Sequence, residues 1–154
     1  MTEPRTLLWT DDEGPGRFEY AARRLTREGW ELVWARSVSD AADVLRSRPV
    51  SALVLDQMLP LGSDTSESTV WGGCALFCWL RGRPVPVGVP GNVALPAGGP
   101  LPGNAGAPVV IVSAYRHDDV EAAILDAAGA SPLSWVGKPL DLDAVRRAIG
   151  GGGR

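Results

Sequence analysis

The chain has 154 residues, of which 45% are hydrophobic and 21% charged, a balance that suits one globular domain and excludes a disordered or fibrous chain. Its formal net charge of -3 disfavours nucleic-acid binding, which depends on clustered lysine and arginine. No apolar run approaches the roughly 18 residues that span a bilayer, and the charged N-terminus does not fit a secretory signal, so we expect a cytoplasmic protein without a membrane anchor.

Five short apolar runs are predicted to be β-strands. Most are unbroken and rich in valine, leucine, isoleucine or tryptophan, which is typical of strands that are covered on both faces of a parallel sheet. The runs are residues 6–9, 31–35, 52–55, 109–112 and 133–136.

Segments with helical spacing follow each of these strands. The first covers residues 18–25 and is expected to stop at Gly29. The second has Ser39 as its expected N-cap and Pro49 just beyond its end. The remaining helices are expected near residues 73–80, 118–128 and 142–149. Strands that alternate with helices in this way predict a doubly wound α/β sheet.

Two stretches interrupt the alternation and are interpreted as insertions. Residues 61–71 form a polar loop rich in serine and threonine, and residues 82–106 contain seven glycines and six prolines. We expect the second insertion to be a flexible surface loop, with a small hairpin over 85–95 as the alternative. The prediction is one domain over residues 1–150 and a glycine-rich tail at 151–154.

Polar side chains follow four of the predicted strands. Asp11 and Asp12 follow the first, Asp56 the third, Ser113 the fourth and Lys138 the fifth. Each has an ordinary explanation when taken alone, such as a helix N-terminal acid, a turn residue or a solvated lysine. However, the carboxyl ends of the strands in an open α/β sheet border its ligand crevice, so we expect these groups to converge.

Such a group of side chains is suited to phosphoryl transfer. Three neighbouring carboxylates repel one another and are stable mainly around a cation. Their hard oxygen ligands suit Mg²⁺, and an aspartate beside that ion can attack phosphorus to form an aspartyl-phosphate. The lysine and the hydroxyl would neutralise charge on the transferred group.

These residues resemble the receiver domain of response regulators in two-component signalling. The resemblance extends from about residue 7 to residue 149, apart from the two insertions, and rests on the order of its motifs along the chain. It implies a five-stranded parallel sheet with the flavodoxin-like order 2-1-3-4-5 and helices on both faces. The motifs are Asp11-Asp12, Asp56-Gln57-Met58-Leu59-Pro60, Val112-Ser113-Ala114 and Lys138-Pro139.

The resemblance also implies a role for each acidic residue. Asp56 would be the phosphoacceptor. Asp12, Asp56 and the backbone carbonyl of Met58 would bind Mg²⁺, and Asp11 would act through water.

The insertion at 61–71, which emerges beside this site, is expected to be a solvated loop, with a lid that screens the phosphoryl group from water as the alternative.

The remaining motif residues would contact the phosphoryl group or respond to it. Ser113, followed by Ala114, resembles the switch hydroxyl, and Lys138, followed by Pro139, the phosphate-contacting lysine. Trp135 occupies the position of the aromatic residue whose burial reports phosphorylation. That position is more often tyrosine or phenylalanine, and a bulky indole does not pivot as freely.

The implied function is that of a phosphoacceptor in signal transduction. A sensor histidine kinase or phosphotransfer protein would donate the phosphoryl group. The surface formed by residues 118–128, 133–136 and 142–149 would then engage an output protein or self-associate. No enzymatic activity is expected beyond transfer to its own aspartate and slow autodephosphorylation.

Three alternatives remain open at the level of sequence. One is a protein-interaction adaptor of the same fold that is never phosphorylated. Another is a phosphohydrolase, although such enzymes typically need a second acid where this chain has Met58. The third is a flavin protein, whose phosphate the acidic residues would repel.

The cysteines and the other tryptophans are expected to be core residues. Cys74 and Cys78 share one helix face, but His117 is the sole further soft metal ligand, so a zinc site is disfavoured and both are interpreted as reduced thiols. The tryptophans assigned to packing are Trp9, Trp30, Trp34, Trp71 and Trp79.

Overall fold

The computed structural model describes residues 5–61, 71–84, 95, 97–114, 118–129 and 132–150. Five parallel strands form one sheet in the order β2-β1-β3-β4-β5. This confirms the predicted fold class and strand order. The strands are β1 (Arg5–Thr10), β2 (Trp30–Ala35), β3 (Ala52–Asp56), β4 (Val109–Ser113) and β5 (Leu133–Gly137).

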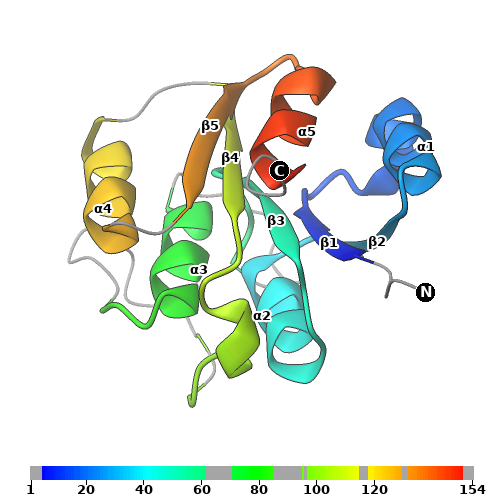
Figure 1. Cartoon of the computed structure of the whole chain (residues 1–154). Coiled ribbons are helices and arrows are strands. Elements are labelled where there is room, and N and C mark those ends of the chain that lie inside the picture. The colour runs from blue at the N-terminus through cyan, green and yellow to red at the C-terminus, as the bar shows by residue number, and fades with distance from the viewer. Residues whose placement is uncertain are drawn as a thin grey trace.

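Helices cover both faces of the sheet, as Figure 1 shows. One face carries α1 and α5, and the other carries α2, α3 and α4. The helices are α1 (Glu19–Arg27), α2 (Val38–Ser47), α3 (Gly72–Leu80), α4 (Asp118–Ala128) and α5 (Leu142–Gly150), and two short 3-10 helices are η1 (Pro15–Phe18) and η2 (Pro102–Asn104). No helix in the described ranges is long and apolar enough to cross a membrane.

The central strand β3 shows why the unbroken apolar runs predict buried strands. All five of its residues are buried. Leu53 and Leu55 point into the cluster beneath α2, α3 and α4, whereas Ala52 and Val54 point into the cluster beneath α1 and α5. Each fully buried leucine contributes about 1.5–3 kcal/mol of transfer free energy. Both faces of the strand therefore stabilise the fold and fix its register.

The remaining packing assignments hold where the structure describes them. Cys74 and Cys78 are free and buried in α3. Every residue of α3 is buried, which accounts for the near absence of polar residues in this helix. The five tryptophans are buried or packed against the two hydrophobic clusters, as predicted for Trp9, Trp30, Trp34, Trp71 and Trp79.

The N-terminus of α2 differs from its prediction. Ser37, not Ser39, is the N-cap: its backbone is extended and its hydroxyl accepts a hydrogen bond from the Asp40 N–H at 3.1 Å. The intervening Val38 is almost completely buried and is already helical. The prediction was wrong by two residues because both serines can cap a helix, and the burial of Val38 selects the earlier one.

The predicted stop of α1 at Gly29 is confirmed, because this glycine follows the helix with a left-handed φ of 95°.

Part of the second insertion is fixed to the body of the protein. The Asn104 side chain is buried and donates to the carbonyls of Leu45 and Arg48, at 2.9 Å each, while it accepts from the Val50 N–H at 2.8 Å. It thus satisfies carbonyls at the end of α2 that have no helical partner. Residues 97–106 are exposed or half-buried except Asn104, which fits the expected surface loop, and the Asn104 side chain anchors this loop to α2. Residues 62–70 and most of 85–95 lie outside the described residues, as does the tail at 151–154, so the lid and hairpin hypotheses remain predictions.

The Asn104→Ala variant is expected to be less stable by about 2–4 kcal/mol, because it removes three hydrogen bonds and leaves the Val50 N–H and the Arg48 carbonyl without this partner, whereas the Leu45 carbonyl keeps the Leu101 N–H. Urea unfolding measures this difference. The Asn104→Asp variant keeps the acceptor oxygen but loses both donated bonds, so it should also be destabilised. Unchanged unfolding midpoints in both variants would contradict the anchoring role.

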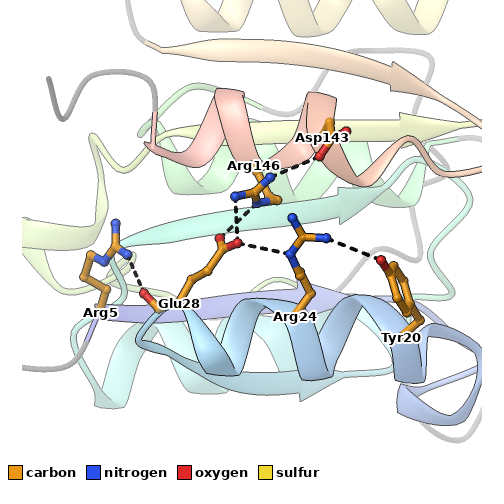
Figure 2. Close-up of polar contacts among 6 residues, drawn as sticks. All are labelled: Arg5, Tyr20, Arg24, Glu28, Asp143 and Arg146. Atoms are coloured by element: carbon orange, nitrogen blue, oxygen red, sulfur yellow. Dashed lines mark hydrogen bonds and ion pairs between the residues drawn. The ribbon is translucent and has the colours of Figure 1, made fainter.

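A polar network joins α1 to α5 (Figure 2). Glu28 is its centre: the Arg146 Nε donates to Glu28 at 2.9 Å, and the Arg24 Nε lies 3.5 Å from the same carboxylate. The hydrogen bond from Arg146 holds the pKa of Glu28 below its usual range. The members of the network are Arg5, Tyr20, Arg24, Glu28, Asp143 and Arg146.

This network predicts an acid-dependent loss of stability. A lowered pKa means that the folded protein releases the Glu28 proton more readily than the unfolded chain, in which the pKa of glutamate is about 4.3. The contribution is therefore present above that value and is lost as the pH falls through the folded pKa. Because the Glu28 side chain is 29% exposed, we expect a modest effect of about 0.5 kcal/mol.

Chemical unfolding between about pH 6 and pH 3 measures this contribution across the titration range of glutamate. The Glu28→Gln variant should lose this part of the pH dependence, and the Arg146→Ala variant should lose most of it, because Arg24 remains beside the carboxylate. Identical profiles for the wild type and both variants would contradict the linkage.

Candidate functional site

Three carboxylates meet at the carboxyl edge of the sheet. Asp11 and Asp12 directly follow β1, and Asp56 is the last residue of the neighbouring strand β3. One carboxylate oxygen from each lies within 4.8 Å of the others. Asp11 and Asp56 are 4% and 3% exposed, whereas Asp12 is exposed to solvent. The structure thus brings together the acids of the first and third predicted strands.

The acidic cluster is electrostatically suited to a cation. Burial raises the pKa of Asp56, and the carboxylate of Asp12 raises it further, against the opposing effects of Lys138 and the Met58 N–H. Burial likewise raises the pKa of Asp11, against a hydrogen bond from the Glu13 N–H. Ionising all the acids together is therefore costly, and a bound divalent cation would remove that cost.

A lysine that follows the edge strand β5 reaches this cluster. The Lys138 Nζ lies 3.6 Å from the Asp56 Oδ1, and the Lys138 N–H donates to the Ser113 carbonyl at 3.0 Å. Ser113 ends β4 and Lys138 follows β5, so adjacent parallel strands deliver both residues to the site. The peptide bond between Lys138 and Pro139 is cis. Four strand ends therefore supply the predicted site residues.

The Asp56 side chain and backbone are held by their neighbours. The Met58 N–H donates to the Asp56 Oδ1 at 3.1 Å, which places Met58 in the turn beside the acids. The Thr10 hydroxyl accepts from the Asp56 N–H at 3.0 Å and donates to the Val54 carbonyl at 3.2 Å. Sequence reasoning did not assign Thr10 a role, although a threonine at the end of an otherwise apolar strand was the available signal.

The start of α3 packs closely against Asp56 and the loop that follows it. A Cβ on Gly73 would lie 2.7 Å from the Asp56 carbonyl oxygen, and one on Gly72 would lie 1.8 Å from the Leu59 carbonyl oxygen. The Gly73 N–H also donates to the Gln57 carbonyl at 3.1 Å. This glycine pair therefore allows the helix to fix the backbone of the candidate site, a role that the sequence analysis missed.

Beside the acids, between α4 and β5, lies a pocket of about 550 Å³. Trp135 is partly buried there and packs against the hydrophobic cluster beneath α4. The pocket extends from this indole to the candidate site. The predicted residues that line it are Ser113, Ala114, Trp135 and Lys138.

No sequence-family model and no curated protein sequence matches this chain. Solved structures do resemble it. A CheY-like response regulator receiver domain protein from Methanospirillum hungatei is 16% identical, with a TM-score of 0.66 over 97% of this chain and 94% of that one. The receiver domain of a signal transduction histidine kinase from Syntrophus aciditrophicus is 18% identical, with a TM-score of 0.63 over 97% of this chain and 93% of that one.

A third structure is a response regulator from Burkholderia pseudomallei described with a phosphorylated aspartic acid, a calcium ion and citrate. It is 16% identical, with a TM-score of 0.61 over 94% of this chain and 66% of that one. At these low sequence identities, the structural likeness shows the fold alone. The chain therefore has the CheY-like fold of response-regulator receiver domains.

Proposed function

We propose that this chain is a signalling domain that accepts a phosphoryl group on Asp56. The observation that carries the proposal is the meeting of three carboxylates with the Lys138 ammonium, whose Nζ lies 3.6 Å from Asp56. The phosphorylated aspartic acid of the Burkholderia neighbour supports the same chemistry by analogy of fold. Of the acids in the cluster, Asp56 alone combines burial with direct contact to the lysine.

The residues of the cluster fit a magnesium ion. Asp11, Asp12 and Asp56 offer hard oxygen ligands, one of them exposed, and the Met58 carbonyl would complete the protein ligands, as the family resemblance implies. When bound, Mg²⁺ would supply charge neutralisation for the oxygens of the phosphoryl group. The raised pKa of Asp11 and that of Asp56, both caused mainly by burial, give the cluster a physical reason to bind it.

The side chains then divide the work of the transfer. An Asp56 carboxylate oxygen attacks the phosphorus of a phosphohistidine, so the new O–P bond forms as the P–N bond breaks and the imidazole leaves with the electron pair. Thr10 and Met58 hold Asp56 in place for the attack. The Lys138 ammonium and the Ser113 hydroxyl stabilise the transferred oxygens.

The partners proposed here follow from this chemistry. The donor is a phosphohistidine on a sensor kinase or a phosphotransfer protein. The output is a protein partner, or a second copy of this chain, that binds the surface formed by α4, β5 and α5. The protein is not an enzyme beyond transfer to its own aspartate and slow loss of the phosphoryl group.

Incubation with acetyl phosphate and Mg²⁺, followed by intact mass measurement, tests the proposal. The wild type is expected to gain one phosphoryl group, and the Asp56→Asn variant none. The Asp43→Asn variant, with its exposed acid on α2, serves as a matched control and should behave as the wild type. An unmodified wild type would instead favour the adaptor that is never phosphorylated.

A further inference from the structure

The paired region of β1 and β3 ends at Thr10 and Leu55, just before two acids of the candidate site. These acids, Asp11 and Asp56, are the next residues along the chain. The strand order reverses between β1 and β3, and an open α/β sheet has its ligand crevice at such a point. Beyond the pairing, the Asp11 N–H donates to the Ala35 carbonyl of β2 at 3.0 Å, so the outer strand holds its main chain.

The acids on the two sides of this crevice repel one another. One carboxylate oxygen each from Asp11, Asp12 and Asp56 lies within 4.8 Å of the others. The repulsion between Asp11 and Asp56 is strengthened by their burial, because a buried pair is screened less than an exposed one. It acts to push the ends of β1 and β3 apart. The width of the crevice therefore depends on contacts that resist this force.

The Thr10 hydroxyl makes such a contact. It donates to the Val54 carbonyl at 3.2 Å and accepts from the Asp56 N–H at 3.0 Å. Val54 and Asp56 are the residues on either side of Leu55, so one side chain of β1 holds β3 at two points. Thr10 is 0% exposed, and its β-branched side chain is stiff. The hydroxyl is therefore a fixed bridge across the floor of the crevice.

The width of the crevice matters because the divalent ions that acids bind differ in size. Mg²⁺ requires near-ideal octahedral geometry, at about 2.0–2.1 Å from its oxygen ligands. Ca²⁺ accepts roughly six to eight oxygens at about 2.3–2.6 Å in a flexible arrangement. A crevice that is held narrow favours the smaller ion, whereas one that repulsion can widen favours the larger ion.

We propose that Thr10 is a positioning residue whose hydroxyl fixes the spacing of the acids on β1 and β3 and thereby gives the site its preference for Mg²⁺ over Ca²⁺. This inference rests on the proposed function, because it concerns the same acids. A side chain of the same shape without the hydroxyl should weaken Mg²⁺ binding more than Ca²⁺ binding. A net hydrogen bond corresponds to about a fivefold change in an equilibrium constant, so we expect the preference to fall by about that factor.

Thermal unfolding of Thr10→Val over a series of Mg²⁺ and of Ca²⁺ concentrations tests the inference. Each protein is compared with its own unfolding temperature in metal-free buffer, so a general loss of stability is not counted as a loss of ion binding. Thr10→Ser keeps the hydroxyl. Thr10→Cys is the second variant should valine impair folding, because a thiol forms weaker hydrogen bonds. Thr6→Val makes the same change at the other end of β1 and is the matched control.

The wild type is expected to bind Mg²⁺ more tightly than Ca²⁺. In Thr10→Val the Kd for Mg²⁺ should rise about fivefold more than the Kd for Ca²⁺, and Thr10→Cys should change in the same direction. Thr10→Ser should retain most of the preference, and Thr6→Val should retain all of it. A purely structural role of Thr10 would instead lower the metal-free unfolding temperature and leave the ratio of the two constants unchanged.

The outcomes that overturn the inference are distinguishable. A wild type that gains no phosphoryl group from acetyl phosphate and Mg²⁺ overturns the proposed function and this inference with it. A wild type that gains the group, while Thr10→Val or its substitute Thr10→Cys keeps the wild-type ratio of the two constants, overturns the role of Thr10 alone. The same holds if the wild type does not prefer Mg²⁺, or if Thr10→Ser loses the preference as fully as Thr10→Val.

Discussion

The Asp56→Asn variant is expected to be more stable than the wild type in metal-free buffer at neutral pH. Burial raises the pKa of Asp56, so in the folded protein its carboxyl group stays protonated to a higher pH than in the unfolded chain, where the pKa of aspartate is about 3.9. Stability therefore falls as the pH rises between the unfolded and folded values, and the loss persists at neutral pH. Removing one of three close acids should raise the free energy of unfolding by about 1–2 kcal/mol. The gain is no larger because the variant also loses the attraction between Asp56 and Lys138.

Thermal unfolding with and without Mg²⁺ measures this effect. The wild type should gain stability from the ion, and Asp56→Asn should gain much less because one ligand is missing. The Asp43→Asn variant, which removes an acid of the same charge from an exposed position, should match the wild type under both conditions. An Asp56→Asn variant that unfolds earlier than the wild type in metal-free buffer would refute the electrostatic account of the cluster.

The second large effect is expected from Lys138→Met, which keeps most of the side-chain length and removes its charge. Lys138 contacts Asp56 directly, and loss of one group that stabilises developing charge lowers such rates by about 10²–10³. The rate of phosphoryl gain from acetyl phosphate at saturating Mg²⁺ should fall accordingly.

A change confined to metal binding would produce a different result. If Lys138 served only to neutralise the acids, saturating Mg²⁺ would restore the rate of Lys138→Met to that of the wild type. We expect no such restoration, because the ammonium would also stabilise charge on the transferred group itself, which neutralising the acids alone would not replace. The Arg17→Met variant removes an exposed cation beside the same acids and should change the rate far less.

The sequence was informative where burial dictates the choice of residues. The unbroken run at β3 and the polar residue directly beyond it predict both a central strand and a group at its carboxyl end, because parallel strands share that edge. The same reasoning located Asp11 and Lys138, which arrive from other strands. Local apolar patterns therefore predicted the strands, and the parallel topology brought their ends together.

Features that depend on tertiary partners could not be read from the sequence. Asn104 lies in a segment of glycine and proline, and nothing local indicates that its amide completes the end of α2. Ser37 and Ser39 are equivalent as caps until the burial of Val38 distinguishes them. The burial of the Gln57 amide, which forms no hydrogen bond with the described residues, could not be predicted either, since an isolated glutamine after a strand is ordinarily solvated.

The most direct measurement is the location of the phosphoryl group itself. After incubation with acetyl phosphate and Mg²⁺, borohydride reduction converts an aspartyl-phosphate into homoserine, which peptide mass mapping then assigns to a position. We predict homoserine at residue 56 and unmodified aspartate at residues 11 and 12. Modification at either of those residues, or its absence from all three, would contradict the assignment of Asp56 as the acceptor.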